Sequence, residues 1–376
     1  MSKPTVAVFF GGNSNEHEIS VITGMLATNL LRGAEYEVVP VYLPKTGGMV
    51  TSQKMRGVED FRTPEAQKFT PVRLSGNTLV RDMGRGKRVA HIDVALNCCH
   101  GGMGEDGTLS ALLAWHGVKL ASPAMPVSAI FMNKHLSKHA AKGLGLPVLD
   151  SFTVGEAEWR ASKDEILARA DEFGYPVVVK PVRLGSSVGI SVAKNSEGLA
   201  AALALAFRLD EDALVEKYLA ERRDINCAAC LIGGKTEVSL CEEAFSQSDI
   251  LTFAEKYEGG ATRRSALPAE LDEELSEKIR TYTRLIYETF RIRGVVRADF
   301  LVAGEEVYFN ELNTVPGSLS CYLFGKTLTE SRSFLVSLVE EGLKSELPQK
   351  EILQSGILHE GIFSGGKGCK RRRNLL

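Results

Sequence analysis

The amino-acid sequence predicts an α/β protein whose first domain is a doubly wound parallel sheet. Short apolar runs alternate with helical patterns along residues 1–122, and glycines follow two of these runs. The expected strands are Thr5–Phe10, Glu37–Leu43 and Val89–Cys99, and the expected helices are Ile19–Leu31 and Leu109–His116. This β-α-β order is typical of parallel sheets with helices on their faces. The polar range 44–88, rich in Gly and Arg, is expected to be an insertion of small strands or loops.

Two α+β segments are expected after this domain. The range 123–220 is expected to contain helices at Phe131–Leu144 and Leu199–Phe207 and strands at Pro176–Val179, Ile190–Ala193 and Ala213–Tyr218. The range 221–346 is expected to contain a helix at Asp272–Phe290, a hairpin within Gly294–Asn313 and a last helix at Glu330–Leu343. The range 347–376, with basic residues in a Gly-rich stretch, is expected to be a mobile tail.

Composition excludes several classes of protein. The 376 residues are enough for two or three domains with sizeable cores. A net charge of −2 favours neither nucleic-acid nor membrane-surface binding. No apolar run approaches the roughly 18 residues that a membrane span needs. The seven cysteines are scattered, and Cys227 and Cys230 lie in a strand-like run that points them to opposite faces, so packing thiols and a reducing cytoplasm are expected.

The most informative stretch is a pair of strands joined by a turn at Gly304–Glu306. Residues two apart on a strand share a face, so Arg297 accompanies Asp299, and Glu311 accompanies Asn313. With the turn at that place, Asp299 lies opposite Glu311. Closely packed, unpaired carboxylates invite a divalent cation, and oxygen-only ligands suit Mg²⁺, which usually shares its shell with phosphates. The alternative is a surface hairpin whose charges pair with one another.

A second candidate site follows the apolar strand that ends at Lys180. The loop after it contains Gly185, Ser186, Ser187 and Gly189. Glycines let backbone N–H groups approach phosphate oxygens closely, and serines add hydroxyl donors. A lysine at the strand end can neutralise the α- and β-phosphates of a nucleotide. The alternative is a flexible hairpin loop with no ligand.

Two more glycine loops stand at strand ends of the first domain. Gly11-Gly12 leads into a helix whose first turn would contain Glu16, and His100 enters a second glycine loop. Strand ends of this kind are a usual ligand-binding edge in α/β sheets, so both side chains are candidate substrate contacts. The alternatives are a dipole-complementing role for Glu16 and a structural role for His100.

Taken together, these stretches resemble the D-alanine–D-alanine ligase family of the ATP-grasp superfamily, over about residues 4–345. The motifs that carry the resemblance are Gly11-Gly12 through Glu16 and Ser20, His100-Gly101 through Thr108, Lys180-Pro181 with Gly185–Gly189, and Asn310–Gly317. The resemblance implies an N-terminal domain and two ATP-grasp subdomains, with ATP held between the second and third domains. It also implies an ADP-forming ligase that joins two D-alanines through an acyl phosphate for peptidoglycan synthesis.

The resemblance further implies roles for individual residues. The implied ATP contacts are Lys134, Lys180, Ser187, Glu216, Tyr218, Leu219, Asp224, Lys256 and Asn310. The implied ligands of Mg²⁺ or Mn²⁺, with two ions accompanying ATP, are Asp299, Glu311 and Asn313. The implied amino-acid contacts are Glu16, His100, Lys256 and Tyr322. The implied catalytic groups are Glu16, Ser186, Tyr257, Arg297 and the backbone of Gly317, of which the last two would stabilise the tetrahedral intermediate.

One departure from the family pattern leaves the second substrate open. Tyr322 stands where the family usually has a serine that binds the carboxylate of the second amino acid. A phenol is bulkier and set differently, although it can still donate a hydrogen bond. The alternatives are therefore a ligase for D-Ser or another second amino acid, and a catalytically weak nucleotide-binding paralogue. Tyr257 is retained, which in the family accompanies amine nucleophiles and favours a D-amino acid over D-lactate. The expected partners are ATP, small D-amino acids and a second copy in a homodimer.

Overall fold

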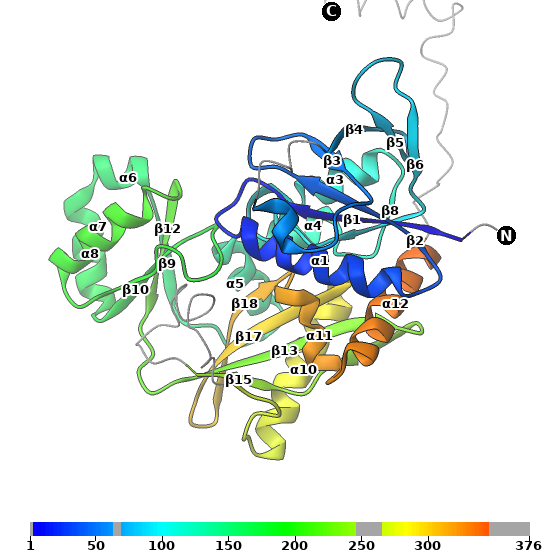
Figure 1. Ribbon diagram of the computed structural model, residues 1–376. Helices are drawn as coiled ribbons and strands as arrows, with labels where there is room; N and C mark the ends of the chain where they lie inside the picture. Colours follow the sequence, from blue (N-terminus) through cyan, green and yellow to red (C-terminus); the bar gives the residue numbers. More distant parts are fainter. Residues whose placement is uncertain (1–2, 63–68, 246–264, 346–376) are drawn as a thin grey trace, which may run out of the picture. The chain divides into compact units, whose positions relative to one another are not determined.

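The computed structural model describes residues 3–62, 69–245 and 265–345. Within these ranges the strands form three sheets, one in each of the three segments expected from the sequence (Figure 1). The predictions for Lys256, Tyr257 and the tail at 347–376 lie outside the described residues.

The first sheet has the strand order β6-β5-β4-β3-β2-β1-β7-β8. Its strands are β1 (Thr5–Gly11), β2 (Glu37–Leu43), β3 (Met49–Thr51), β4 (Thr70–Ser75), β5 (Thr78–Arg81), β6 (Arg88–His91), β7 (Val94–Asn97) and β8 (Lys119–Leu120). The predicted parallel centre is present, because β1 pairs in parallel with β2 and β7, and β7 with β8. Strands β3 to β6 extend β2 as an antiparallel meander that includes the expected insertion.

The prediction of one strand over Val89–Cys99 is wrong. The chain there forms two strands, β6 and β7, at different places in the sheet. Strand β6 closes the antiparallel meander, whereas β7 pairs in parallel with β1 at the buried centre. Only Ile92 and Asp93 separate the two strands, so hydrophobicity alone does not reveal the break between them.

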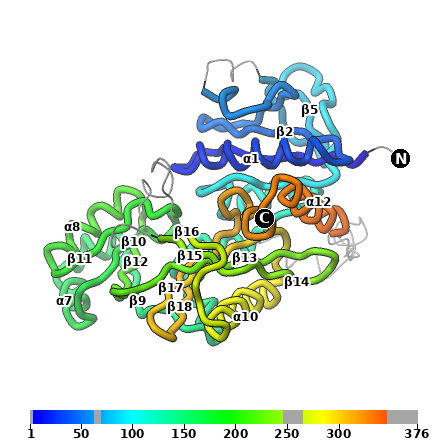
Figure 2. The backbone as a smooth tube through the Cα atoms, turned by 60° about the horizontal axis from the view of Figure 1, so that its bottom comes forward, coloured from blue at the N-terminus to red at the C-terminus, as the bar shows by residue number. Residues whose placement is uncertain are grey.

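The helices of the first segment are α1 (His17–Arg32), the short 3₁₀ helix η1 (Val58–Phe61), α2 (Gly102–Glu105) and α3 (Thr108–Trp115). Helix α1 buries an apolar face that includes Val21, Met25 and Leu31. That face shares a core with Phe334 and Leu338 of the last helix, α12 (Leu328–Lys344). The two helices can be followed in blue and orange in Figure 2. The last helix therefore completes the core of the first segment.

The second sheet has the order β11-β10-β12-β9. Its elements are β9 (Ser151–Gly155), α6 (Glu156–Ala161), α7 (Lys163–Phe173), β10 (Val177–Pro181), β11 (Ser191–Ala193), α8 (Ser196–Ala206) and β12 (Asp212–Lys217). Alternate residues of β10, such as Val177 and Val179, form a core with Leu199 and Leu203 of α8. This packing supports Lys180 at the end of a buried strand.

The helix predicted over Phe131–Leu144 is present but begins later, and a separate helix that was not predicted precedes it. Two helices, α4 (Met125–Met132) and α5 (Lys134–Gly143), are separated at Asn133, whose backbone is extended. The Asn133 side chain accepts a hydrogen bond from the backbone N–H of Leu136 and so caps α5. The break places Lys134 at the first position of α5. Both helices pack on the third sheet.

The third sheet has the order β16-β15-β13-β17-β18, with β14 paired to β13. Its elements are β13 (Arg223–Ile232), β14 (Lys235–Val238), β15 (Glu242–Ala244), β16 (Ser265–Ala266), α10 (Glu273–Thr289), β17 (Val295–Ala303) and β18 (Glu306–Asn313). The 3₁₀ turn η3 (Gly317–Ser320) and α11 (Cys321–Phe324) follow before α12. Cys227 and Cys230 are buried free thiols, in agreement with packing roles.

The β17–β18 hairpin reaches the predicted pairing by a different path. Ala303 pairs with Glu306, so the turn is one residue shorter than expected. A bulge between Asp299 and Phe300 then shifts the register, and Asp299 lies opposite Glu311 as predicted. The extra residue of this bulge is Asn310. Bulges re-aim side chains, and here the bulged residue lines the candidate site.

Candidate active site

A cavity of about 400 Å³ is lined by residues of all three sheets and their loops. The predicted residues that line it are Glu16, His100, Lys134, Lys180, Ser186, Ser187, Glu216, Leu219, Asp224, Arg297, Asp299, Asn310, Glu311, Asn313, Gly317 and Tyr322. Tyr218 does not line this cavity; the guanidinium of Arg222 lies 5.9 Å from the centre of its ring. The motifs predicted from four separate stretches therefore meet at one place.

The predicted metal ligands lie together on the β17–β18 hairpin, and both of their carboxylates already have cationic partners. Arg297 holds Asp299 through two hydrogen bonds of 2.7 and 2.8 Å, and Asn313 Nδ2 donates to Asp299 Oδ2 at 3.0 Å. Lys134 Nζ lies 3.3 Å from Glu311 Oε2. Burial alone would lower the pKa of Arg297, but the charge and hydrogen bonds of Asp299 hold it well above its ordinary value.

Two carboxylates and an amide oxygen fit a hard cation such as Mg²⁺. Asp299, Glu311 and Asn313 all line the cavity, and Asp299 and Glu311 are directly opposite each other across the hairpin. Among the described residues, no three His, Cys, Asp or Glu side chains are grouped to hold a metal. The candidate set has only two such residues, so phosphate and water oxygens would have to complete the shell.

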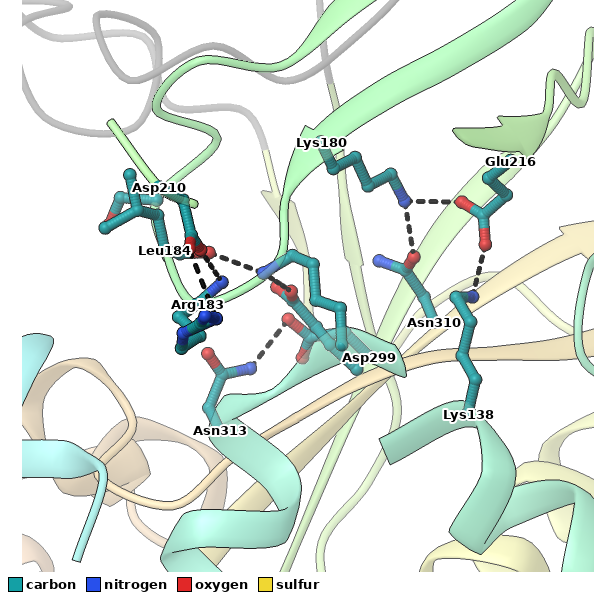
Figure 3. Close-up of polar contacts among 12 residues, drawn as sticks. Lys138, Lys180, Arg183, Leu184, Asp210, Glu216, Asp299, Asn310 and Asn313 are labelled. Atoms are coloured by element: carbon teal, nitrogen blue, oxygen red, sulfur yellow. Dashed lines mark hydrogen bonds and ion pairs between the residues drawn. The ribbon is translucent and has the colours of Figure 1, made fainter. Parts of the chain in front are cut away.

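At another part of the cavity, a buried carboxylate lies between two lysines (Figure 3). Glu216 pairs with Lys180 at 2.6 Å through one oxygen and with Lys138 through the other. Burial alone would raise the pKa of Glu216, but the two lysines lower it to about 2. Lys180 also donates to Asn310 at 3.1 Å, which links the second sheet to the hairpin bulge.

Sequence reasoning missed Lys138, although a signal was present. It follows Lys134 by four residues, and residues at that spacing share one helix face. Both lysines are buried on α5. Burial lowers the pKa of Lys138, and the charge of Glu216 opposes that change. Helical spacing from Lys134, which the resemblance implied, could therefore have indicated Lys138.

The loop after Lys180 joins the second sheet to the first domain. Ser186 and Ser187 both have a positive φ, of 52° and 58°, and the hydroxyl of Ser186 donates a hydrogen bond to Glu16. A Cβ at Gly185 would lie 2.9 Å from a Glu16 carboxylate oxygen, so a larger residue there would displace the Glu16 side chain. Glu16 is the residue just before α1 rather than part of its first turn.

The sequence predictions also omitted Glu105, an acidic residue that lines the cavity. Its carboxylate accepts hydrogen bonds from the backbone N–H groups of Gly101 at 2.9 Å and of Val315 at 3.1 Å, which joins the first domain to the end of the hairpin. Burial and the nearby charge of Glu16 raise the pKa of Glu105 to about 7. The two carboxylates therefore form a negative region on the first-domain side of the cavity.

His100 is held as a neutral, buried side chain. Burial lowers its pKa to about 4, and its Nε2 lies 2.9 Å from the Thr23 hydroxyl. The same hydroxyl accepts a hydrogen bond from the backbone N–H of Ser318 at 3.2 Å. Ser318, Leu319 and Ser320 all have a positive φ near 50°, a costly conformation for residues other than glycine. His100 and Thr23 thus support the strained turn that follows Gly317.

Two family models match most of the chain. The model described as the N-terminus of D-ala D-ala ligase matches residues 5–123, and the one described as its C-terminus matches residues 140–342. The chain belongs to the D-alanine–D-alanine ligase family. A family relative from Campylobacter lari is 34% identical over 84% of this chain and 88% of its own length. A relative from Thermosipho melanesiensis is 32% identical over 90% of this chain and 93% of its own.

Solved structures of the D-alanine–D-alanine ligase family agree. The D-alanine–D-alanine ligase from Helicobacter pylori superposes with a TM-score of 0.74 at 28% identity, covering 90% of this chain and 98% of that one. The VanG D-Ala:D-Ser ligase from Enterococcus faecalis gives a TM-score of 0.76 at 26% identity, with coverage of 90% and 99%. The predicted family and the ATP-grasp fold class are thereby confirmed. Within the described part of the chain, no helix is long and apolar enough to cross a membrane.

Proposed function

We propose that the protein uses ATP to join two D-alanine molecules through an amide bond, by way of an acyl phosphate. The observation that carries the proposal is one cavity with lysines on one side, carboxylates on another, and Arg297 and Gly317 on its wall. The lysine side suits a triphosphate, and the carboxylate side suits ammonium groups. Relatives named D-alanine–D-alanine ligase, at 31–34% identity over most of the chain, support the substrate.

ATP binds, in this proposal, where Lys134 and Lys180 line the cavity. Both lysines are nearly buried, so their charges act in a region of low dielectric. The hydroxyls and backbone of the loop at Ser186–Ser187 add neutral donors for phosphate oxygens. Positioning and charge neutralisation are the main contributions a protein makes to phosphoryl transfer.

A Mg²⁺ ion held by Asp299, Glu311 and Asn313 would supply charge neutralisation for the transferring phosphoryl group. Arg297 and Lys134 touch this oxygen set. Their positive charges offset the repulsion between the two carboxylates and hold the oxygens close together. The same contacts keep Arg297 beside the cavity, where it is available to a developing oxyanion.

The first D-alanine binds with its ammonium near Glu16, and its carboxylate receives the phosphoryl group. The neutral amine of the second D-alanine then attacks the acyl carbon, and Arg297 and the Gly317 N–H stabilise the oxyanion. Breaking of the bond from the acyl carbon to the phosphate oxygen releases inorganic phosphate, and loss of a proton from the nitrogen leaves the amide. One such donor is typically worth about 3–4 kcal/mol in the transition state. The strained turn at Ser318–Ser320, supported by Thr23, holds this backbone in position. We place this reaction in the cytoplasm, as a step of peptidoglycan synthesis. The protein acts, in this proposal, as a homodimer that binds ATP and D-amino acids.

The test is to incubate the purified protein with ATP, Mg²⁺ and single or paired D-amino acids, and to record ADP release and product mass. D-alanine alone is expected to yield the dipeptide. ATP binding without turnover for any substrate would instead support the nucleotide-binding paralogue and would refute the ligase proposal.

A second candidate function is a ligase with another second amino acid, such as D-Ser. Tyr322 favours it, because that residue replaces the serine expected from the family pattern and lines the cavity. The likeness to VanG, a D-Ala:D-Ser ligase, supports it further, since that protein carries out such a reaction on a similar fold. A product that forms only from a mixed pair in the experiment above would select this candidate.

A further inference from the structure

Lys138 is a buried cation beside the cavity that the proposed mechanism does not use. It lies on α5 one helical turn after Lys134, and only 4% of the residue is exposed. Lys134, Lys180 and Glu216 line the cavity, whereas Lys138 does not. Lysine is almost never fully buried unless its charge is paired. The position of Lys138 therefore needs an explanation in terms of its partner.

The partner of Lys138 is Glu216, which also contacts Lys180. In the pairing of β10 with β12, Glu216 lies opposite Val178, two residues before Lys180. Glu216 and Lys180 therefore share one face of the second sheet. One carboxylate oxygen of Glu216 contacts Lys180 at 2.6 Å, and the other contacts Lys138 (Figure 3). Each oxygen thus has a lysine of its own.

The groups of this cluster keep their charges although they are buried. Burial opposes the ionisation of Glu216, but the two lysines lower its pKa to about 2, so the carboxylate is negative. Burial lowers the pKa of Lys138, and the negative charge of Glu216 opposes this change and favours the ammonium form. Two positive charges therefore surround one negative charge.

The contact with Glu216 both positions Lys180 and competes for it. Lys180 Nζ donates to Glu216 at 2.6 Å and to Asn310 Oδ1 at 3.1 Å, so its ammonium lies between the second sheet and the hairpin bulge. A lysine held in this way is preorganised for an anion in the cavity. A nearby carboxylate, however, attracts the same ammonium and repels phosphate oxygens. The outcome depends on how strongly Glu216 attracts Lys180.

We infer that Lys138 is a positioning residue: it holds the second oxygen of Glu216 and so keeps Lys180 in place to contact the phosphates of ATP. The inference rests on the ATP-binding part of the proposed function. Without Lys138, both oxygens of Glu216 would act on Lys180, and the ammonium would be drawn away from Asn310 and the cavity. Lys138 thus acts on the nucleotide through Glu216 and Lys180.

The experiment titrates the purified protein with a non-hydrolysable ATP analogue and Mg²⁺ by isothermal titration calorimetry, without any amino acid. The test variant is Lys138→Met, which keeps the length of the side chain and removes its charge. The matched control is Lys142→Met, because Lys142 lies one turn further along the same helix and is exposed. Urea unfolding curves establish that each variant is folded under the conditions of the titration.

Lys138→Met is expected to weaken binding of the analogue by roughly tenfold to a hundredfold, as is usual when one member of a buried charge pair is removed. Lys138→Gln, a second neutral variant that keeps a hydrogen-bond donor for Glu216, is expected to weaken it in the same direction. Lys142→Met is expected to change the affinity by less than about twofold. The KM for D-alanine at saturating ATP is expected to stay unchanged in all three, whereas a general loss of packing would raise it as well.

A double-mutant cycle separates the positioning role from a direct attraction between Lys138 and the nucleotide. Lys138→Met is also introduced into Glu216→Gln, where no carboxylate competes for Lys180. The loss of affinity caused by Lys138→Met is expected to be at least roughly threefold smaller in that background than in the wild type. Equal losses in the two backgrounds would mean that Lys138 attracts ATP directly, and the inference would be overturned.

Two further results would also overturn the inference. The affinity for the analogue could be unchanged in Lys138→Met, or the Kd of the analogue and the KM for D-alanine could rise together. The proposed ligase function fails by a different result, in which the wild type binds the analogue but forms no dipeptide from ATP and D-alanine. The calorimetric comparison still decides the role of Lys138 in that case. A wild type that does not bind the analogue would overturn both.

Discussion

The two sides of the cavity differ in the sign of the charge that surrounds their buried carboxylates. Glu216 lies between Lys138 and Lys180, and its pKa is lowered to about 2. Glu105 is buried near Glu16, and its pKa is raised to about 7. Burial acts on both in the same direction, so the neighbouring charges decide the outcome.

This difference supports the proposed place of each ligand. The lysine side is electropositive and partly neutralised by Glu216, which suits the charge of a triphosphate. The carboxylate side, with Glu16 and Glu105, suits ammonium groups of amino acids. Arg297 and Gly317 line the same cavity, where the proposed reaction needs an oxyanion site.

The largest effect is expected from Glu311→Gln on the lysine side. Removing one carboxylate of the proposed metal set should lower the rate of ADP release by at least roughly a hundredfold, comparable to losing a key electrostatic group in a transition state. The urea unfolding curve should remain close to wild type, because Glu311 is partly exposed. Glu306→Gln, an exposed residue of the same strand, is the matched control. Near-normal turnover in Glu311→Gln would contradict the metal assignment.

The part of the candidate site that lies on the β17–β18 hairpin could be predicted from the sequence. Arg297, Asp299, Glu311 and Asn313 lie on one hairpin, so strand periodicity alone places them together. The predicted pairing is correct although the turn is one residue shorter than expected, because the bulge at Asn310 compensates. Local patterns of this kind need no knowledge of tertiary structure.

The contacts between domains could not be predicted in this way. Glu105 meets Val315 across 210 residues of sequence, and Lys180 meets Asn310 across 130. Glu242 faces Tyr322 only because β13, β15 and α11 come together in the folded chain. The break at Asn133 escaped prediction because an asparagine can cap a helix or lie within one, and only the extended backbone decides.

The second largest effect is expected in Glu216→Gln, measured as the free energy of unfolding in urea. This change leaves Lys138 and Lys180 buried without their shared anion, and breaking a buried pair costs about 3–5 kcal/mol. Glu172→Gln, an exposed residue of α7, should change stability by less than about 0.5 kcal/mol. An equal effect of the two substitutions would mean that the lysine side tolerates uncompensated charge, and the comparison would fail.

Opposite pH dependences should separate the two carboxylates. The pKa of Glu216 is lowered, so its contribution to stability is present above pH 4.5 and is lost as pH falls towards 2. The pKa of Glu105 is raised, so the folded state binds the extra proton and stability falls as pH rises from 4.5 through 7, by at most about 3 kcal/mol. Glu105→Gln should flatten the unfolding free energy between about pH 5 and 7.5, whereas Asp106→Asn should not. An unchanged slope in Glu105→Gln would place the proton elsewhere.

The smallest effect is expected for a charge pair outside the cavity. Lys45 Nζ lies 2.7 Å from Glu18 Oε1, with side chains 52% and 69% exposed. The hydrogen bond from Lys45 lowers the pKa of Glu18, yet water and salt screen an exposed pair. Lys45→Ala should therefore cost no more than about 0.5 kcal/mol, and less at high ionic strength. A loss above about 1 kcal/mol, or a change in ADP release, would mean that charge matters as much on the surface as inside the cavity. The distinction between the two sides would then lose its basis, since it assumes that burial strengthens the effect of each neighbouring charge.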